Sequence, residues 1–344
     1  MPTFSMKKLK YSLALCVFAT FLAGCQCNNG DDKIQVPEVN EDSLPKVEVK
    51  IKRYEKALFT LDVKKLQEGL KKIQPEFALF LDGDLNDPQN IEQLSLYIQD
   101  PAIRDHYEAC TTKYPELTWL EKELSSSFSL YSYWFPGKKI PEVYTYVSGG
   151  DFESPIKNAD SALIIAIDLY LGKDYGFYGS CGVPAYKSQW MDKPYIARDC
   201  MEELGIPLCS SEKKDGDFLE QMVSMGKLMY FLDVTMPESP DSIKIKYTGA
   251  GLDWCKKNEG NVWAFFIDNK ILYSKNKNDF LKFFADGPFT SSFGKESPPR
   301  IAIWVGWQIV RAYMDETQGA DITSLLKETD AQKILQKSKY KPKK

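Results

Sequence analysis

Cys25 is the residue whose surroundings point most clearly to a chemical reaction. A basic start (residues 7–10) and an apolar run (residues 13–22) precede it, and two small residues stand directly before it. The apolar run is too short to span a bilayer, and the pattern is typical of a bacterial lipoprotein signal. We therefore predict that residues 1–24 are a cleaved signal peptide and that Cys25 is acylated, with palmitate among its chains. A plain secretory peptide, or a membrane helix with a chance cysteine, is the alternative.

Several acyl chains on one residue would hold the protein firmly on a lipid bilayer, since each buried CH₂ contributes about 0.8 kcal/mol. Removal of the signal takes away three lysines and no acids, which leaves 41 basic and 48 acidic residues and a net charge of −7. A mildly acidic chain with scattered lysines has no basic face for a nucleic-acid backbone. Binding of nucleic acid is therefore not expected.

The single histidine, His106, limits the possible catalytic chemistry. A His-Glu-x-x-His zinc helix needs two histidines, and a serine or cysteine nucleophile activated by imidazole would have to use this one. His106 stands in a charged helical stretch, residues 104–108, far from any nucleophile elbow. We expect it to be a solvated helix residue, so histidine-dependent catalysis is effectively excluded.

Other reactive patterns are weaker. No pair among the 48 acids is singled out for glycoside hydrolysis, and the aromatic residues 175–179 fit buried packing better than a sugar site. Residues 249–251 lack the rest of a phosphate-binding motif, and residues 82–87 lack the glycine and glutamate of a calcium loop. No cofactor is implied. One disulfide among four cysteines is left open, without a connectivity: Cys181, Cys200, Cys209 and Cys255.

These groups must be positioned by a body that follows a flexible, polar tether at residues 25–44. Alternating residues 45–53 predict a first strand, and apolar runs at 143–147 and 162–167 predict two neighbouring strands of a small sheet. Residues 170–197 are expected to form a loop rich in glycine, tyrosine and proline.

The other predicted elements are helices, inferred from the three- and four-residue spacing of their apolar residues. Early helices are broken at four prolines, and one long helix follows; the apolar run 301–310 is expected to be a buried helix because it is too short for a membrane. The fold class is therefore α+β, predominantly helical, with a small sheet embedded among helices in a single domain over residues 45–344. The expected proline breaks are Pro75, Pro88, Pro101 and Pro115, and the expected helices are 117–135, 218–232, 249–267, 279–285, 300–313 and a basic tail helix ending near Tyr340.

Many segments, in order, resemble the gliding motility lipoprotein GldB family of Bacteroidetes. The resemblance covers most of the mature chain, and it implies an envelope lipoprotein needed for gliding, with partners in the gliding or type IX secretion machinery. The matching segments are Lys52–Phe59, Tyr133–Pro136, Pro141–Thr145, Ile167–Gly172, Gly226–Tyr230, Asn258–Glu259 with Trp263, Ser297–Ala302, Gly306–Val310 and Ser338–Pro342.

That family in turn is similar to a predicted zincin-type group of zinc peptidases. Gly226 and Tyr230 then stand at the two histidine ligand positions, Lys227 at the general base, and Glu259 at the third ligand. A lysine in place of the carboxylate would repel Zn²⁺, and tyrosine is a poor substitute ligand. The resemblance thus implies a zincin-like but catalytically inactive domain with no metal, in which Lys227 and Glu259 could form a buried ion pair. The alternative is that the helix is ordinary core and the alignment coincidental.

Two classes of function remain. The first is a non-enzymatic envelope scaffold that acts through protein partners; the second is an envelope small-ligand-binding protein or carboxylate-based hydrolase, using groups around residues 170–190. Asp31 and Asp32 come six and seven residues after Cys25, late for a surface-export signal. We therefore favour a periplasm-facing protein over a surface-exposed one.

Overall fold

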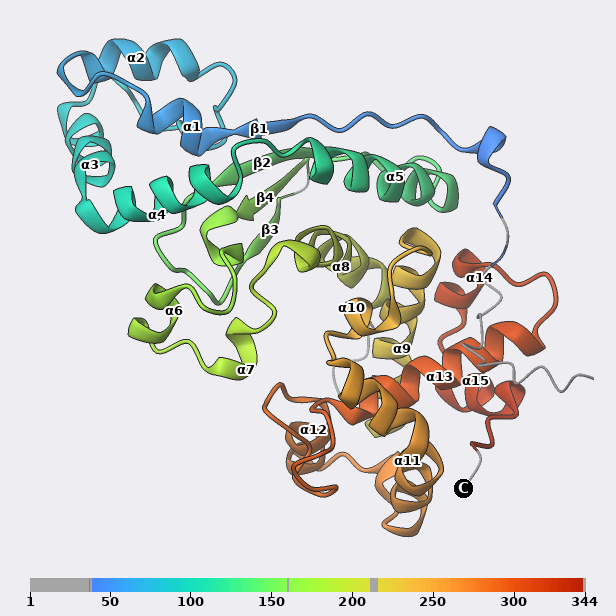
Figure 1. The fold of residues 1–344 in the computed structure, drawn as a ribbon. Helices are drawn as coiled ribbons and strands as arrows, with labels where there is room; N and C mark the ends of the chain where they lie inside the picture. Colours follow the sequence, from blue (N-terminus) through green and yellow to red (C-terminus); the bar gives the residue numbers. More distant parts are fainter. Residues whose placement is uncertain (1–36, 38, 160, 211–215, 343–344) are drawn as a thin grey trace, which may run out of the picture. The chain divides into compact units, whose positions relative to one another are not determined.

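A four-stranded sheet with the order β1-β2-β4-β3 organises the first half of the chain in the computed structural model, which describes residues 37, 39–159, 161–210 and 216–342 (Figure 1). Its strands are β1 (Ile51–Arg53), β2 (Glu142–Tyr146), β3 (Ile156–Ala159) and β4 (Ala162–Ala166). β1, β2 and β4 are parallel, and β3 pairs antiparallel with β4. The predicted α+β class, predominantly helical, is confirmed.

The two predicted neighbouring strands are confirmed as β2 and β4. Val143 pairs with Leu163 and Thr145 with Ile165, and all four residues are buried. Strands covered on both faces show continuous apolar runs, which is why their sequences could be recognised. β3 was not predicted, because three of its four residues are exposed and its sequence has no apolar run.

The first strand is shorter than predicted, because its early residues bond to a helix and not to another strand. The N–H groups of Val47, Val49 and Ile51 donate to side chains of α5 (Thr118–Trp134). The acceptors are Ser129 Oγ at 3.3 Å, Ser125 Oγ at 3.0 Å and Glu121 Oε1 at 3.0 Å. Four-residue spacing on the helix thus closes this edge of the sheet.

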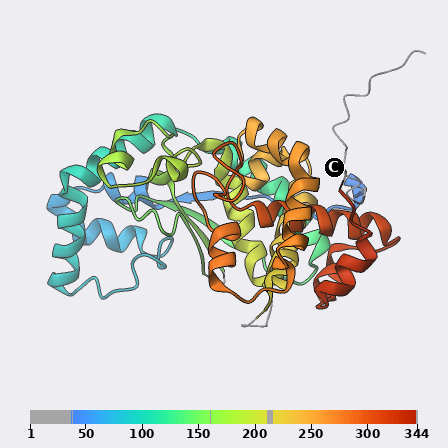
Figure 2. The ribbon, with the colours of Figure 1, turned by 90° about the horizontal axis from the view of Figure 1, so that it is seen from below.

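The helices before the sheet are α1 (Tyr54–Phe59), α2 (Leu66–Ile73), α3 (Pro88–Gln99) and α4 (Pro101–Lys113). As predicted, the prolines mark boundaries, and the helices α3 and α4 each begin on one, behind a capping aspartate. Figures 1 and 2 both show α1–α4 at the opposite end of the described chain from α14 and α15.

The helices after the sheet form most of the core. Two short helices interrupt the predicted loop 170–197, and α8 was not predicted at all, because Gly205 and Pro207 weaken its helical pattern. The remaining predicted helices are present within a few residues of their expected ends. The described helices after the sheet, predicted or not, are α6 (Gly176–Ser180), α7 (Ala185–Ser188), α8 (Ile196–Cys209), α9 (Phe218–Thr235), α10 (Asp241–Ile245), α11 (Gly249–Asp268), α12 (Lys277–Phe284), α13 (Ile301–Glu316), α14 (Ile322–Lys327) and α15 (Ala331–Ser338).

α9 and α13 pack against each other at the centre and are buried almost all round. The apolar run 301–310 is part of α13, so the expectation of a buried helix is confirmed. Within the described part of the chain, no helix combines the length and the apolar character needed to cross a bilayer. The predicted signal peptide and most of the predicted tether fall outside the described residues.

Candidate functional site

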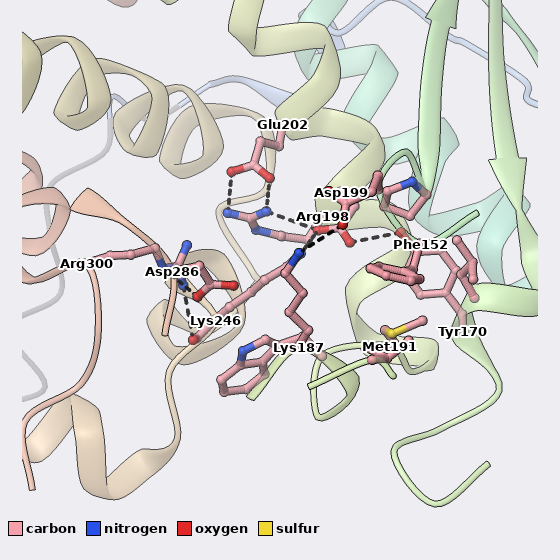
Figure 3. Close-up of a pocket in the computed structure, with 15 residues that line it drawn as sticks. Phe152, Tyr170, Lys187, Met191, Arg198, Asp199, Glu202, Lys246, Asp286 and Arg300 are labelled. Carbon is pink, nitrogen blue, oxygen red and sulfur yellow. Dashed lines mark hydrogen bonds and ion pairs between the residues drawn. The ribbon is translucent and has the colours of Figure 1, made fainter. Parts of the chain in front are cut away.

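A pocket of about 240 Å³ lies beside the first half of α8 (Figure 3). Its lining comes from segments far apart in the sequence: the loop before β3, the stretch between β4 and α8, the turn after α10, and the residues leading into α13. Charged groups occupy one part of the lining and aromatic or aliphatic groups the other.

Arg198 is the centre of the charged part, and it is fully engaged. Both oxygens of Glu202, one helical turn later on α8, accept from its guanidinium, one of them at 2.7 Å. Asp199 Oδ1 accepts from Arg198 Nη1 at 3.0 Å, and Asp199 Oδ2 accepts from the Tyr170 hydroxyl at 2.9 Å. Arg198 is 1% exposed, so this network is a buried floor for the pocket.

Two further cations, Lys246 and Arg300, reach the same pocket from backbone in the left-handed region, with φ of 55° and 54°. That conformation costs a non-glycine residue about 1 kcal/mol. Lys246 Nζ lies 2.7 Å from Asp199 Oδ1, and Arg300 Nη2 donates to the Ile245 carbonyl at 2.7 Å. Arg300 Nε is buried, 3.6 Å from Asp286 Oδ1, and makes no hydrogen bond with any described residue.

The opposite side of the pocket is largely apolar. Figure 3 shows Phe152, Tyr170 and Met191 across from Arg300 and Asp286. Trp190 also lines the pocket and packs edge-on against Tyr195, with ring centroids 5.4 Å apart. The apolar part of a bound ligand would be shielded from water on this side, while its polar part would contact the charged side chains opposite.

The pocket is lined by equal numbers of cationic and anionic side chains, and this balance limits the chemistry that it can support. Arg198, Lys246 and Arg300 face Asp199, Glu202 and Asp286. Burial disfavours the charged form of Glu202, but the charges of Arg198 and Lys246 outweigh this and lower its pKa. A general acid needs a raised pKa, so Glu202 is unsuited to that role. The arrangement is better suited to holding a neutral or zwitterionic group than to proton transfer.

A second, more open hollow of about 760 Å³ adjoins the first, since Trp190 and Lys246 line both. Its walls include Trp254 and Tyr247, together with Pro298. Aromatic and proline faces beside scattered polar groups could hold an extended chain rather than a compact molecule.

The predicted degenerate site lies elsewhere, on α9. Gly226 faces the backbone of Gly306 on α13, and a Cβ on Gly226 would come 2.2 Å from the Gly306 carbonyl oxygen. A Cβ on Gly306 would in turn come 2.0 Å from the Met222 carbonyl oxygen. No side chain fits at Gly226, the position predicted for the first ligand, because two helix backbones meet there.

Lys227 and Glu259 each bond to a residue near the C-terminus. Lys227 Nζ donates to the Glu328 carbonyl oxygen at 2.5 Å, and burial lowers its pKa. Glu259 accepts at 2.5 Å from the hydroxyl of Tyr340, and burial raises its pKa. The expected Lys227–Glu259 ion pair is therefore wrong, because each group has a nearer partner in the C-terminal segment. The Tyr230 hydroxyl is buried with no hydrogen-bond partner among the described residues.

Comparison with known proteins decides the family. A family model described as gliding motility protein GldB matches residues 34–342, nearly the whole described chain. The chain belongs to the GldB family. This membership indicates a gliding-motility-associated envelope lipoprotein. Comparisons with curated proteins and with solved structures gave no match. The zincin-like part of the fold prediction stays a prediction.

In this GldB-family chain, the residue predicted to carry the lipid, Cys25, lies outside the described residues. Among those that are described, no three His, Cys, Asp or Glu side chains gather in a way that could hold a metal ion. The open alternative of a disulfide is not realised in the described chain: Cys200, Cys209 and Cys255 are buried free thiols and Cys181 is an exposed one.

The expectation for His106 is wrong. It is 2% exposed, because Phe177 packs on its ring with centroids 3.9 Å apart and the Tyr175 hydroxyl lies 3.0 Å from its Nδ1. Burial lowers its pKa. Residues 175–179, expected to pack and not to bind sugar, are the segment that covers it.

The charged side of the pocket was not predicted from the sequence. Arg198, Asp199 and Glu202 fall in the stretch to which no helix had been assigned. Their spacing, with oppositely charged groups four residues apart, was the available signal for a helix, and for an internal ion pair. Lys246 and Arg300 carry no local signal, because only the fold brings them to α8.

Proposed function

We propose that this GldB-family protein is a non-catalytic, lipid-anchored component of the cell envelope that acts through protein partners in gliding or protein secretion. The observation that carries the proposal is the contact of Gly226 with Gly306, because it leaves no room for a side chain where the resemblance predicts the first zinc ligand. Lys227 at the base position and the buried Tyr230 at the second ligand position support it. None of the three offers the carboxylate or imidazole that zinc peptidase chemistry needs.

Metal analysis tests the non-catalytic part of this proposal. We expect the purified, folded protein to contain zinc well below one ion per chain after dialysis without chelator. Zinc bound in stoichiometric amount would contradict the proposal. A chelator-treated sample, compared by thermal unfolding, provides the control: removal of a structural metal would lower the unfolding temperature, and we expect no change.

In-cell photocrosslinking tests the partner part. A photoreactive residue at Lys187, on the rim of the pocket, is compared with one at Lys64, an exposed lysine just before α2 that does not line the pocket. We expect components of the gliding or secretion machinery to be captured in stoichiometric yield from position 187 only. Recovery of the protein alone from both positions would contradict the scaffold function.

A second candidate function is the binding of a small ligand, and the pocket of Figure 3 is the observation that favours it. Its balanced charges and apolar wall suit a neutral or zwitterionic molecule of amino-acid size. Its carboxylates are held in ion pairs with cations, which does not favour a hydrolase. A thermal-shift screen of amino acids, dipeptides and neutral sugars tests this. A stabilising ligand should lose its effect in Trp190→Ala and keep it in Tyr186→Phe, a tyrosine outside the lining.

The periplasm-facing orientation is part of the proposal and rests on the late position of Asp31 and Asp32 after Cys25. Protease treatment of intact cells tests it. We expect the protein to survive until the outer membrane is opened, while digestion in intact cells would place it on the surface.

A further inference from the structure

The segment formed by residues 267–284 exposes apolar side chains to solvent. It covers the end of α11, the turn that follows and α12. Ile267, Tyr273 and Leu281 are 49%, 58% and 67% exposed, and they are three of the seven large apolar side chains that the described chain exposes. We call residues 267–284 the α12 surface. Such a concentration in so short a segment is unusual for scattered surface residues.

The α12 surface is also basic, although the protein as a whole is acidic. It holds four lysines and two aspartates in a chain whose net charge is −4. Asp279 is engaged by the Ser274 hydroxyl at 2.5 Å. No ion pair joins any of the four lysines to another described residue. The lysines are Lys270, Lys275, Lys277 and Lys282.

The surface is held in place by its inner side. Phe283 packs against Phe265 and Phe266 of α11, with ring centroids 6.1 and 5.1 Å apart, and Phe280 packs against Phe218 at 5.7 Å. With these rings turned inward, Lys277 and Leu281 lie one helical turn apart on the exposed side of α12. Apolar and cationic groups are thus presented together on a packed element.

We infer that the α12 surface contacts the anionic phospholipids of the membrane to which the protein is anchored. Exposed leucine and tyrosine side chains can enter the interfacial layer, while lysines beside them reach the phosphate groups. Each lysine close to an anionic surface favours binding by about fivefold. An acyl anchor fixes only one point of the chain. This second contact would hold the body against the bilayer in a defined orientation.

Quenching of tryptophan fluorescence by brominated lipid tests the inference on the full acylated chain in vesicles. Leu281→Trp is compared with Leu96→Trp, since the two leucines are 67% and 65% exposed. Leu96 lies among residues 61–100, which hold eight acidic and four basic residues. With phosphatidylglycerol in the vesicles, we expect the fluorescence added at position 281 to be quenched and that added at position 96 to be unaffected.

Reversing the charge of two lysines tests whether the quenching depends on the basic side chains. In the Leu281→Trp background, Lys275→Glu with Lys277→Glu should abolish the quenching, whereas Lys64→Glu with Lys65→Glu, the same change of net charge, should leave it intact. Circular dichroism confirms that each variant is folded. Absence of quenching at position 281, equal quenching at both positions, or quenching that persists after reversal or without phosphatidylglycerol would each overturn the inference. The quenching experiment uses vesicles without any protein partner, so its result is independent of whether a partner binds the pocket.

Discussion

Gly226 and Gly306 bring α9 and α13 into backbone contact, since a Cβ on the first would lie 2.2 Å from the carbonyl oxygen of the second. The glycine that stands at a predicted zinc-ligand position is therefore required by helix packing. The helix to which the zincin comparison assigns the catalytic groups, α9, is a central packing element of this structure.

Gly226→Ala tests this contact. The two helices would have to separate, and overpacking of this kind lowers the free energy of unfolding by about 3 kcal/mol. Gly249→Ala is the matched control, because nothing lies within 4 Å of its added Cβ, and we expect a change below about 1 kcal/mol. Urea unfolding of both variants measures the difference, and equal effects would contradict the packing role.

Asp233 is a fully buried carboxylate that binds three other side chains of the core. It accepts from Arg311 through both oxygens at 2.8 Å, from Trp307 Nε1 at 2.7 Å and from Lys244 Nζ at 2.9 Å. Asp233→Asn would leave two buried cations short of a counter-charge, at a cost of about 3–5 kcal/mol.

Asp241→Asn provides the comparison for that variant. Asp241 also binds Arg311, at 2.8 Å, but its side chain is 26% exposed and Arg311 would keep Asp233. We expect a loss of about 1 kcal/mol in the free energy of unfolding, measured by denaturant titration. A larger loss for Asp241→Asn than for Asp233→Asn would show that burial does not determine the contribution of these carboxylates.

His106 makes stability depend on pH in a direction that can be derived. Burial lowers its pKa below the usual value for histidine of about 6.5, so the unfolded chain takes up a proton more readily than the folded one. The stabilising contribution is present above pH 6.5 and is lost as the pH falls through the folded pKa. Because the chain has one histidine, comparison with His106→Asn isolates the contribution of histidine titration to stability. Unfolding measured at pH 7.5 and 5.5 should show a smaller fall in the variant than in the wild type.

Tyr170→Phe tests the floor of the pocket. It removes the 2.9 Å hydrogen bond to Asp199 Oδ2, a buried charged acceptor, and should cost about 1–3 kcal/mol. Tyr186→Phe is the control, because that hydroxyl makes no hydrogen bond with the described residues; we expect a change within about 0.5 kcal/mol. The free energies of unfolding of the two variants are measured by calorimetry. Equal losses would refute the stabilising role of the Tyr170–Asp199 hydrogen bond.

Elements with strong local patterns were predicted well. α5, α9, α11 and α13 follow from apolar spacing, and β2 and β4 from runs of apolar residues that both faces of the sheet bury. α8 and β3 were missed because their local patterns are weak: α8 contains Gly205 and Pro207, and β3 is largely exposed. Periodicity predicts the elements that bury a regular face, and it fails where burial is partial or a helix breaker intervenes.

The sequence alone determined the family and most of the longer described helices, and it carries the predicted lipoprotein signal, because each depends on residues close together in the chain. Only the tertiary structure decided which groups meet. Asp233 and Arg311 are 78 residues apart, and Arg300 reaches the pocket of Arg198 from another helix. The burial of His106 likewise depends on residues 175–177. Contacts of this kind follow from how the elements pack, and no local spacing encodes them.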